Sequence, residues 1–287
     1  MIENTSDVQR YLFKFYYRGS TKFFGSQRQK ELLTVEGCLL NTLKETKYIE
    51  SVKRSKIEFA SRTDRFVSAK GSAFAFNTLK LPILMEINRA LPNEIGLWAY
   101  TEVPQNFLSR FNAVYRHYKY IVPQPLTFLK KKKNIDINLM HKACKKLVGK
   151  HNFRNFAKIE NNEKKFIRDM DSVKLSILND YIVFDFKSRA FLRQQVRRMV
   201  KKILELGIGD INYEQFLKLF DDSIEMSYQP ADPKGLILWD IKYDHNIKFK
   251  IDLKSKERLN KYFLIQEYRY AHKQQLFKIL QQNDFSQ

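Results

Sequence analysis

Runs of apolar residues divide the first hundred residues of the chain into short strands and helices. The run "YLFKFYY", from Tyr11 to Tyr17, is rich in aromatic residues and predicts a strand. Thr34 precedes apolar residues at helical spacing, so a helix capped by Thr34 is expected next. Further strands are expected at "SKIEF", "GSAFAFNT" and "IGLWAYTEVP", and a helix at "LPILMEINRAL" with Pro82 in its first turn.

The following residues show a similar order of elements. The segment "YRHYKYIV" alternates as a strand, and "PQPLTFLKKKK" predicts a loop that ends in four lysines. Asn138 is expected to cap a helix that ends at Gly149. The runs "VKLSIL" and "YIVFDF", separated by "ND", predict a hairpin. A helix from about Phe191 to Glu205 and a strand at "GLILWDIKY" follow.

This repeated order predicts an α+β fold in which two related units share one sheet. We expect the first unit at residues 8–110, the second at 111–246, and a charged helical extension at 247–287. Within this extension, residues 255–280 are expected to form a helix with one packed face and one solvated face.

Composition adds a core and a strong positive field to this picture. The chain has 287 residues, of which 44% are hydrophobic, so it can bury a sizeable core. Its 52 Lys and Arg outnumber 31 Asp and Glu, giving a formal charge of +21. A field of this strength favours a polyanionic partner such as nucleic acid, although a lysine-rich proteome is an alternative explanation.

Cysteine and histidine usage gives no sign of a disulfide framework or a metal site. Cys38 and Cys144 both fall within apolar helical patterns, where cysteine acts as a small core residue. The five His are scattered and no Cys-x-x-Cys pair is present, so no metal site is predicted. No signal peptide or membrane span is predicted, and a cytoplasmic protein is expected.

The loop "ASRTDRFVSAKG" offers the first candidate for chemistry. It places the carboxylate of Asp64 between Arg62 and Arg65. Neighbouring positive charge favours an ionised carboxylate, which suits a nucleophile or an electrostatic anchor. On the residues alone, a solvated surface aspartate or an Asx turn is the better explanation, because such charge clusters are common.

A second candidate is Tyr118 in the strand "YRHYKYIV". Alternation places Tyr118 and Tyr120 on one face of the strand, and His117 and Lys119 on the other. A tyrosine there can stack on an extruded base or exchange a proton with it. The alternative is a half-buried tyrosine with a packing role only.

The third candidate is the basic helix "SRAFLRQQVRRMVKKIL". Arg193 and Arg197 are one turn apart beside its apolar stripe, so one guanidinium can reach inward to a carboxylate. We expect Arg198, Lys201 and Lys202 to face phosphate or water instead.

Together these segments resemble the motifs of the TruA family of tRNA pseudouridine synthases, in its archaeal or eukaryote-like form. "SRTDRFVSA" resembles the family's G-R-T-D-x-G-V-[HS]-A motif, and "YRHYKYIV" resembles its R-x-Y-x-Y segment. "AFLRQQVRRMV" is similar to the family helix, and "PADPKGLILWDIKY" to the closing strand. The segment "YYRGSTKFFGSQRQKELLTVEGCLLNTL" is similar to the N-terminal block. Five motifs in family order span roughly residues 11–243.

The resemblance implies a pseudouridine synthase fold, with two RRM-like or ferredoxin-like halves whose joined antiparallel sheet surrounds a central basic cleft. It also implies a homodimer that isomerises uridine to pseudouridine in the anticodon stem-loop of tRNA, without metal or cofactor. By position it assigns the following roles: Asp64 as nucleophile, Tyr118 in base stacking and proton abstraction, Arg197 as the ion-pair partner of Asp64, Arg62 and Leu236 (or Leu238) in nucleotide binding, and Gln27 and Arg28 in RNA contacts.

Four positions depart from the family pattern. Phe66 replaces a glycine that tolerates positive φ, so a different turn is expected there. Ser68 replaces histidine, Arg18 replaces the aspartate of Y-D-G-T, and Ser26 replaces tryptophan.

Three other functions are compatible with parts of this pattern. One is a pseudouridine synthase that acts at other positions of tRNA or on other structured RNA. Another is a non-catalytic RNA-binding protein with two RRM-like halves, but the chain lacks the aromatic RNP1 pattern. A metal-dependent nuclease fits less well, because no acidic cluster accompanies Asp64.

Overall fold

The computed structural model describes residues 8–159 and 165–282. The last five residues of the predicted C-terminal extension, 283–287, lie outside them. The strands are β1 (Gln9–Tyr17), β2 (Glu58–Phe59), β3 (Ser68–Thr78), β4 (Ile95–Val103), β5 (Tyr115–Pro125), β6 (Gly149–Asn152), β7 (Ile167–Leu178), β8 (Tyr181–Ser188), β9 (Leu236–Lys242) and β10 (Lys250–Ile251). The α-helices are α1 (Val35–Glu45), α2 (Leu84–Ala90), α3 (Leu126–Lys133), α4 (Ile137–Leu147), α5 (Gln195–Gly207), α6 (Tyr213–Leu217) and α7 (Leu253–Leu280). Short 3₁₀ turns occur at η1 (Arg154–Phe156), η2 (Lys218–Phe220) and η3 (Pro233–Gly235).

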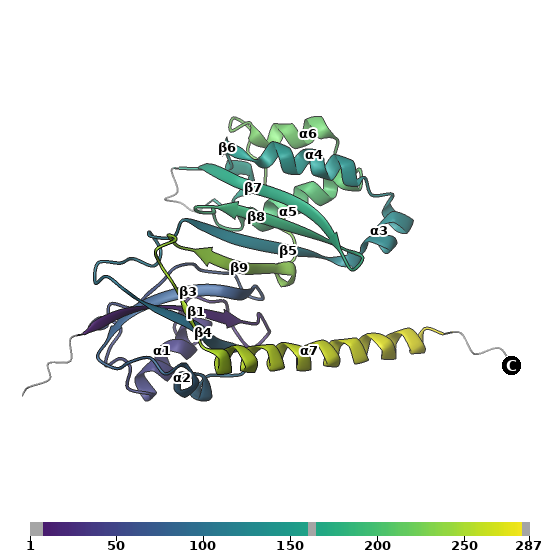
Figure 1. The fold of residues 1–287 in the computed structure, drawn as a ribbon. Helices are drawn as coiled ribbons and strands as arrows, with labels where there is room; N and C mark the ends of the chain where they lie inside the picture. Colours follow the sequence, from purple (N-terminus) through teal and green to yellow (C-terminus); the bar gives the residue numbers. More distant parts are fainter. Residues whose placement is uncertain (1–7, 160–164, 283–287) are drawn as a thin grey trace, which may run out of the picture.

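The described strands form one ten-stranded, mostly antiparallel sheet in the order β10-β4-β1-β3-β9-β5-β8-β7-β6, with β2 paired to β3. This confirms the predicted α+β class. The pairing of β3 with β9 is parallel and short, at Ser68–Ile237 and Ala69–Leu238. Figure 1 shows α1 and α2 beside β1, β3 and β4, and α4, α5 and α6 at the β7–β8 end.

A buried lysine strengthens the junction between β3 and β9. Lys14 of β1 donates hydrogen bonds to the carboxylate of Asp240 and the carbonyl of Ile241, both on β9. Burial lowers the pKa of Lys14, while Asp240 acts in the opposite direction. Because β3 lies between β1 and β9, this contact adds a side-chain link across a junction that has few backbone pairs.

Aromatic side chains from alternate strand positions fill the core. The ring of Phe13 stacks on Phe74 and Phe76, with centroid distances of 5.2 and 4.9 Å. Phe184 and Phe186 of β8 are fully buried at the other end of the sheet. The aromatic run predicted as the first strand is therefore a core strand, and this large apolar burial stabilises the sheet.

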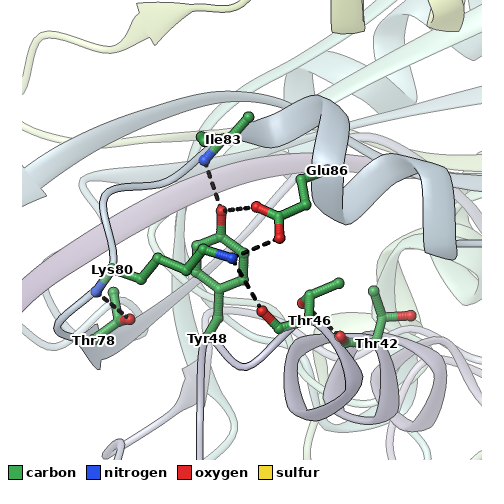
Figure 2. Close-up of polar contacts among 7 residues, drawn as sticks. All are labelled: Thr42, Thr46, Tyr48, Thr78, Lys80, Ile83 and Glu86. Carbon is green, nitrogen blue, oxygen red and sulfur yellow. Dashed lines mark hydrogen bonds and ion pairs between the residues drawn. The ribbon is translucent and has the colours of Figure 1, made fainter.

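A polar cluster fixes the N-terminus of α2, which lacks a capping side chain of its own (Figure 2). The Ile83 N–H donates to the Tyr48 hydroxyl, which in turn donates to Glu86 at 2.9 Å. Lys80 pairs with Glu86 at 2.6 Å and also donates to the carbonyl of Thr46. Pro82 precedes the helix instead of occupying its first turn, and Tyr48 supplies the missing cap.

The prediction of a loop ending in four lysines is wrong, because Leu126–Lys133 form helix α3. Leu126 and Leu129 lie one turn apart and are buried, while lysine is a good helix former. Asn134, with φ of 47°, ends the helix in the left-handed conformation.

Several predicted element boundaries also shift. Asp136, not Asn138, caps α4 by accepting from the Leu139 N–H at 2.8 Å. Helix α4 ends at Leu147, before Gly149. Helix α5 begins at Gln195 instead of near Phe191, and the "SKIEF" strand shortens to the two residues of β2. The hairpin between β7 and β8 is confirmed, with positive φ at both turn residues.

Helix α7 is buried only along its first turns, although Tyr262 and Phe263 also contact the ring of Tyr16 and Tyr270 accepts a hydrogen bond from Arg18. Ser255 and Leu259 are buried, and Arg258 donates to Tyr16 and Asn93. From residue 271 to 280 every side chain is exposed, and Figure 1 shows the helix extending past the sheet. The predicted packed face is therefore wrong from residue 271 to residue 280. None of the described helices is both long and apolar enough to cross a membrane.

Candidate active site

Asp64 lies in the loop that connects β2 to β3. Its backbone carbonyl accepts from the Val67 N–H at 3.3 Å, which closes a tight turn. Phe66 occupies this turn with φ of 69°. The sequence led us to expect a different turn here, because a bulky residue avoids positive φ. The structure shows that Phe66 adopts the left-handed conformation that glycine adopts freely.

The segment after β1 supports this loop from one side. The Thr63 N–H donates to the Ser26 hydroxyl at 2.7 Å, and the Ser26 N–H donates to the Thr63 carbonyl at 3.2 Å. The hydroxyls of Tyr17 and Thr63 lie 2.7 Å apart. A Cβ on Gly19 would come within 2.1 Å of the Phe66 carbonyl oxygen, so the backbones meet there. Ser26, where the family has tryptophan, thus has a structural role.

Arg116 of β5 supports the start of the same loop and was missed by the sequence analysis. Its buried guanidinium donates to the carbonyl of Ala60 at 2.7 Å and to that of Arg110 at 2.9 Å. Arg116 is the first residue of the R-x-Y-x-Y segment, and its alternation with Tyr118 could have placed it on the inner face.

The structure brings Arg197 of α5 to Asp64 across 133 positions of sequence. Arg197 Nη1 donates to Asp64 Oδ2 at 2.8 Å, while Nε donates to the Ala231 carbonyl at 2.7 Å. The Arg197 side chain is 10% exposed and that of Asp64 is 35% exposed. The guanidinium is therefore fixed at two points, and the carboxylate remains accessible from outside.

Tyr118 of β5 lies behind the loop, with its hydroxyl 3.2 Å from that of Ser61. Its ring is buried and meets Phe191 edge-on, with centroids 5.1 Å apart. Burial raises the pKa of Tyr118, and the negative charge of Asp64 raises it further. The phenol is therefore neutral at pH 7, which favours stacking and hydrogen bonding over deprotonation.

The two leucines of β9 lie opposite the two inward tyrosines of β5. Leu238 is paired with Tyr118, and Leu236 with Tyr120. Both leucines are buried. Burial raises the pKa of Tyr120 to about 12, with Asp232 raising it and Arg197 lowering it. Leu238 is thus in register with Tyr118, and Leu236 lies two pairs further along, on the same face.

The remaining predicted site residues lie on the surface around the loop. Arg62, Gln27 and Arg28 are exposed. The Arg28 N–H donates to the Glu36 carboxylate at 3.0 Å. Burial raises the pKa of Glu36, although the charges of Arg62 and Arg28 act against this rise. These three residues can contact a ligand from outside, but the structure does not place them beside Asp64 in a single contact network.

The prediction that the other cations of α5 face phosphate or water is wrong for two of them, which pack on a tyrosine ring. The Arg198 residue is 8% exposed, and its guanidinium lies 5.0 Å from the ring centroid of Tyr228. Lys202 lies over the same ring at 4.2 Å and pairs with Glu205 at 2.8 Å. Lys201 is more exposed and also pairs with Glu205. Tyr228, 30 positions away, could not be anticipated from helical spacing.

The opposite face of β5 carries a separate ionic group. His117 and Lys119 contact Asp185 of β8 at 2.5 and 2.7 Å, as the alternation of the strand predicts. Burial alone would raise the pKa of Asp185, but these two partners lower it overall. Across the described residues, no group of three or more His, Cys, Asp or Glu is arranged to hold a metal ion.

Comparison with known proteins gives a consistent result. A model of the tRNA pseudouridine synthase family matches residues 143–244, a range that includes Arg197 and Leu236. The chain is 39% identical over 264 residues to tRNA pseudouridine synthase A of Methanosphaera stadtmanae, covering 91% of this chain and 93% of that protein. It is 33% identical to the protein of the same name from Thermococcus sibiricus, covering 89% and 92%. The corresponding identity to the Pyrococcus furiosus protein is 31%, covering 85% and 86%.

Proposed function

Because the chain belongs to the tRNA pseudouridine synthase A family, we propose that it isomerises uridine to pseudouridine in tRNA at a site built around Asp64. The ion pair between Asp64 and Arg197 is the observation that carries this proposal. It joins two family motifs that lie far apart in the sequence, and it leaves the carboxylate accessible.

The reaction exchanges one bond of the ribose for another. The bond between C1′ and N1 of uracil breaks, the base turns, and a bond forms between C1′ and C5. The proton on C5 leaves and N1 gains a proton, so substrate and product are isomers. Such a reaction needs a group that stabilises or attacks C1′ and a site that holds the detached base.

Asp64 is the residue that we propose to act at C1′. A nucleophilic carboxylate must be ionised. Arg197 donates one hydrogen bond to Asp64 and another to the Ala231 carbonyl, and this fixed geometry keeps its positive charge beside the carboxylate. The supports from Ser26 and Arg116 hold the loop without using the carboxylate. Attack from a preorganised loop needs little rearrangement in the transition state.

Tyr118 is proposed to stack on the target base. Its raised pKa makes the phenol neutral, so a direct role as phenolate in removing the C5 proton is disfavoured. The apolar contact to the base falls to Leu236 or Leu238, and the register of β9 with β5 supports Leu238 as the closer neighbour of Tyr118.

The RNA contacts are proposed from exposure and charge. A uridine in a stem must leave the stack before it can react, which requires a few kcal/mol. Arg62 is an exposed cation two residues from Asp64, so it can hold the extruded nucleotide, while Gln27 and Arg28 contact the flanking RNA. We propose the anticodon stem-loop as the target region and a charge of +21 as the source of RNA affinity.

The finer architecture follows the same proposal. Residues 8–110 and 111–246 are proposed as two related halves that meet at the β3–β9 pair, with the RNA in a basic cleft between them. Residues 247–287 are proposed as an extension, and the active form as a homodimer.

Release of tritium from C5 of labelled uridine in tRNA tests the activity. The proposal predicts one equivalent of tritium released for each modified site, with unchanged rate in the presence of a chelator. Mapping with a pseudouridine-specific reagent should place the product in the anticodon stem-loop. A protein that binds tRNA without releasing tritium would be a non-catalytic RNA-binding protein.

A further inference from the structure

Phe66 combines a strained backbone with a position two residues from Asp64. Its φ of 69° lies in the left-handed region, which bulky side chains seldom enter. The close approach of Gly19 to the Phe66 carbonyl fixes this backbone from outside. A glycine would adopt the same conformation without strain. Strain that the surroundings maintain is a feature of functional sites.

Two cations from different loops lie close to the ring of Phe66. The Arg65 guanidinium lies 4.8 Å from its centroid, and the Lys234 ammonium lies 5.7 Å from it. Arg65 also lies 4.1 Å from the ring centroid of Phe24 and donates to the Thr21 carbonyl at 3.2 Å. All three distances to ring centroids are within the range of cation–π attraction.

These contacts form an aromatic bridge, which we define as Phe24, Arg65, Phe66 and Lys234. It connects the segment after β1, the loop that carries Asp64, and the turn η3 before β9. The η3 turn begins two residues after Ala231, whose carbonyl anchors Arg197. The bridge therefore joins the loop that carries the carboxylate to the loop that holds its guanidinium partner.

We propose that Phe66 is a positioning residue for the reaction: its ring fixes the Asp64 loop against the Ala231–Lys234 segment, so that Asp64 and Arg197 keep their relative orientation. The proposal rests on the pseudouridine synthase activity proposed above. The aromatic side chain, and not the bulk at position 66, provides the link. The backbone strain is the consequence of placing a ring where glycine would fit.

Three substitutions separate the ring from the strain. Phe66→Tyr keeps the ring, Phe66→Leu keeps the strained Cβ without a ring, and Phe66→Gly removes both. Tyr213→Leu is the matched control. It removes a cation–aromatic pair far from Asp64 in the sequence, in which the Lys142 ammonium of α4 lies 3.9 Å from the ring centroid of Tyr213 on α6. We expect kcat for tritium release to fall between about 10-fold and 100-fold in Phe66→Leu and Phe66→Gly, with KM for tRNA within about twofold of the parent. Phe66→Tyr and the Tyr213→Leu control should retain the parental kcat.

The melting temperature shows whether this loss is merely structural. Phe66→Gly relieves the strained φ, so it should melt above Phe66→Leu while being no more active than it. If Phe66→Gly is as active as the parent, the ring has no positioning role and the proposal is overturned. A rise in KM with unchanged kcat would also overturn it, because it would make Phe66 an RNA contact.

Amide hydrogen exchange tests the bridge without depending on catalysis. The Val67 N–H bonds to the Asp64 carbonyl, and the Ala231 N–H bonds to the Arg197 carbonyl. The proposal predicts faster exchange at both amides in Phe66→Leu and parental rates in Phe66→Tyr. Parental exchange in Phe66→Leu would contradict the bridge. A parent protein that releases no tritium but shows the predicted exchange pattern would contradict the proposed function alone.

Discussion

Removing the Arg197 guanidinium should lower both the activity and the stability of the protein. Arg197→Ala deletes the 2.8 Å bond to Asp64 and the 2.7 Å bond to the Ala231 carbonyl. Loss of one partner of a fully buried ion pair destabilises proteins by about 3–5 kcal/mol. Because the Asp64 side chain is 35% exposed, water can solvate the carboxylate that remains, and the loss should be smaller.

The magnitude follows from the bonds that are lost. A hydrogen bond that involves a charged group contributes about 1.5–3 kcal/mol when buried, and exposure at Asp64 reduces that figure. We expect Arg197→Ala to lower the free energy of unfolding by about 1–3 kcal/mol. The Ala231 carbonyl also loses its donor, so Arg197→Met, which restores apolar volume without a donor, should be only partly stabilising relative to Ala.

Urea unfolding and single-turnover tritium release together measure these effects. The rate of release should fall at least about 100-fold in Arg197→Ala, because a misplaced reacting group loses about that factor. Arg197→Lys keeps the charge but cannot bridge Asp64 and Ala231 with a planar fork, so it should be intermediate. A severe loss of rate with an unchanged urea midpoint would refute the reasoning that this guanidinium is an inward-facing structural partner.

Three further outcomes are expected. Tyr118→Phe keeps the stacking ring and should lower kcat for tritium release less than about 10-fold, whereas a loss above about 1,000-fold would assign an acid–base role to the hydroxyl. Gly19→Ala should lower the free energy of unfolding by more than about 2 kcal/mol, because its Cβ meets the Phe66 carbonyl. Gly209 has φ of +80° and no atom within 4 Å of an added Cβ, so Gly209→Ala should lower the free energy of unfolding by only about 1 kcal/mol. Equal losses in Gly19→Ala and Gly209→Ala would exclude the clash at Gly19. Asp185 has a lowered pKa, so its contribution to stability is present above its ordinary pKa of 3.8 and declines as the pH falls further. Urea midpoints measured between about pH 6 and pH 3 should therefore show a weaker acid dependence in Asp185→Asn, and parallel curves would contradict this assignment.

Local sequence patterns were sufficient to predict structural features that depend on neighbouring residues. The alternation of "YRHYKYIV" placed Tyr118 and Lys119 on opposite faces, because side chains of a strand alternate between faces. The "ND" turn between β7 and β8 followed from the same kind of rule, since both residues adopt positive φ. Helix α3 could not be predicted in this way. Its four consecutive lysines suggested a solvated loop, although Leu126 and Leu129 are buried.

Contacts between segments that lie far apart in the sequence could not be predicted from local patterns. Helical spacing allowed either Arg193 or Arg197 to reach inward, and only the family resemblance chose Arg197. The burial of Arg198 depends on Tyr228, which comes from an irregular segment after α6. The absence of a packed face from residue 271 to residue 280 of α7 has a similar cause, since a sequence with mixed polar and apolar residues does not reveal where the body of the protein ends.

Phe66 and Ser26, which depart from the family motif, show a different limit of prediction from sequence. Comparison with the family motif marked both positions, but not their consequences. The structure gives Ser26 a pair of bonds to Thr63 and gives Phe66 a left-handed backbone. Both consequences depend on how the segment after β1 lies against the Asp64 loop, a contact between residues about 40 positions apart.

The comparison of Asp64→Asn with the parent in single-turnover tritium release tests the central claim most directly. Asparagine preserves the size of the side chain and can still accept a hydrogen bond from Arg197, so the fold should be maintained. Asp185→Asn is the matched control, because it neutralises a carboxylate on the other face of β5. We predict no detectable release from Asp64→Asn, parental release from Asp185→Asn, and undiminished tRNA binding by both. Parental release from a folded Asp64→Asn protein would show that another residue performs the chemistry at C1′.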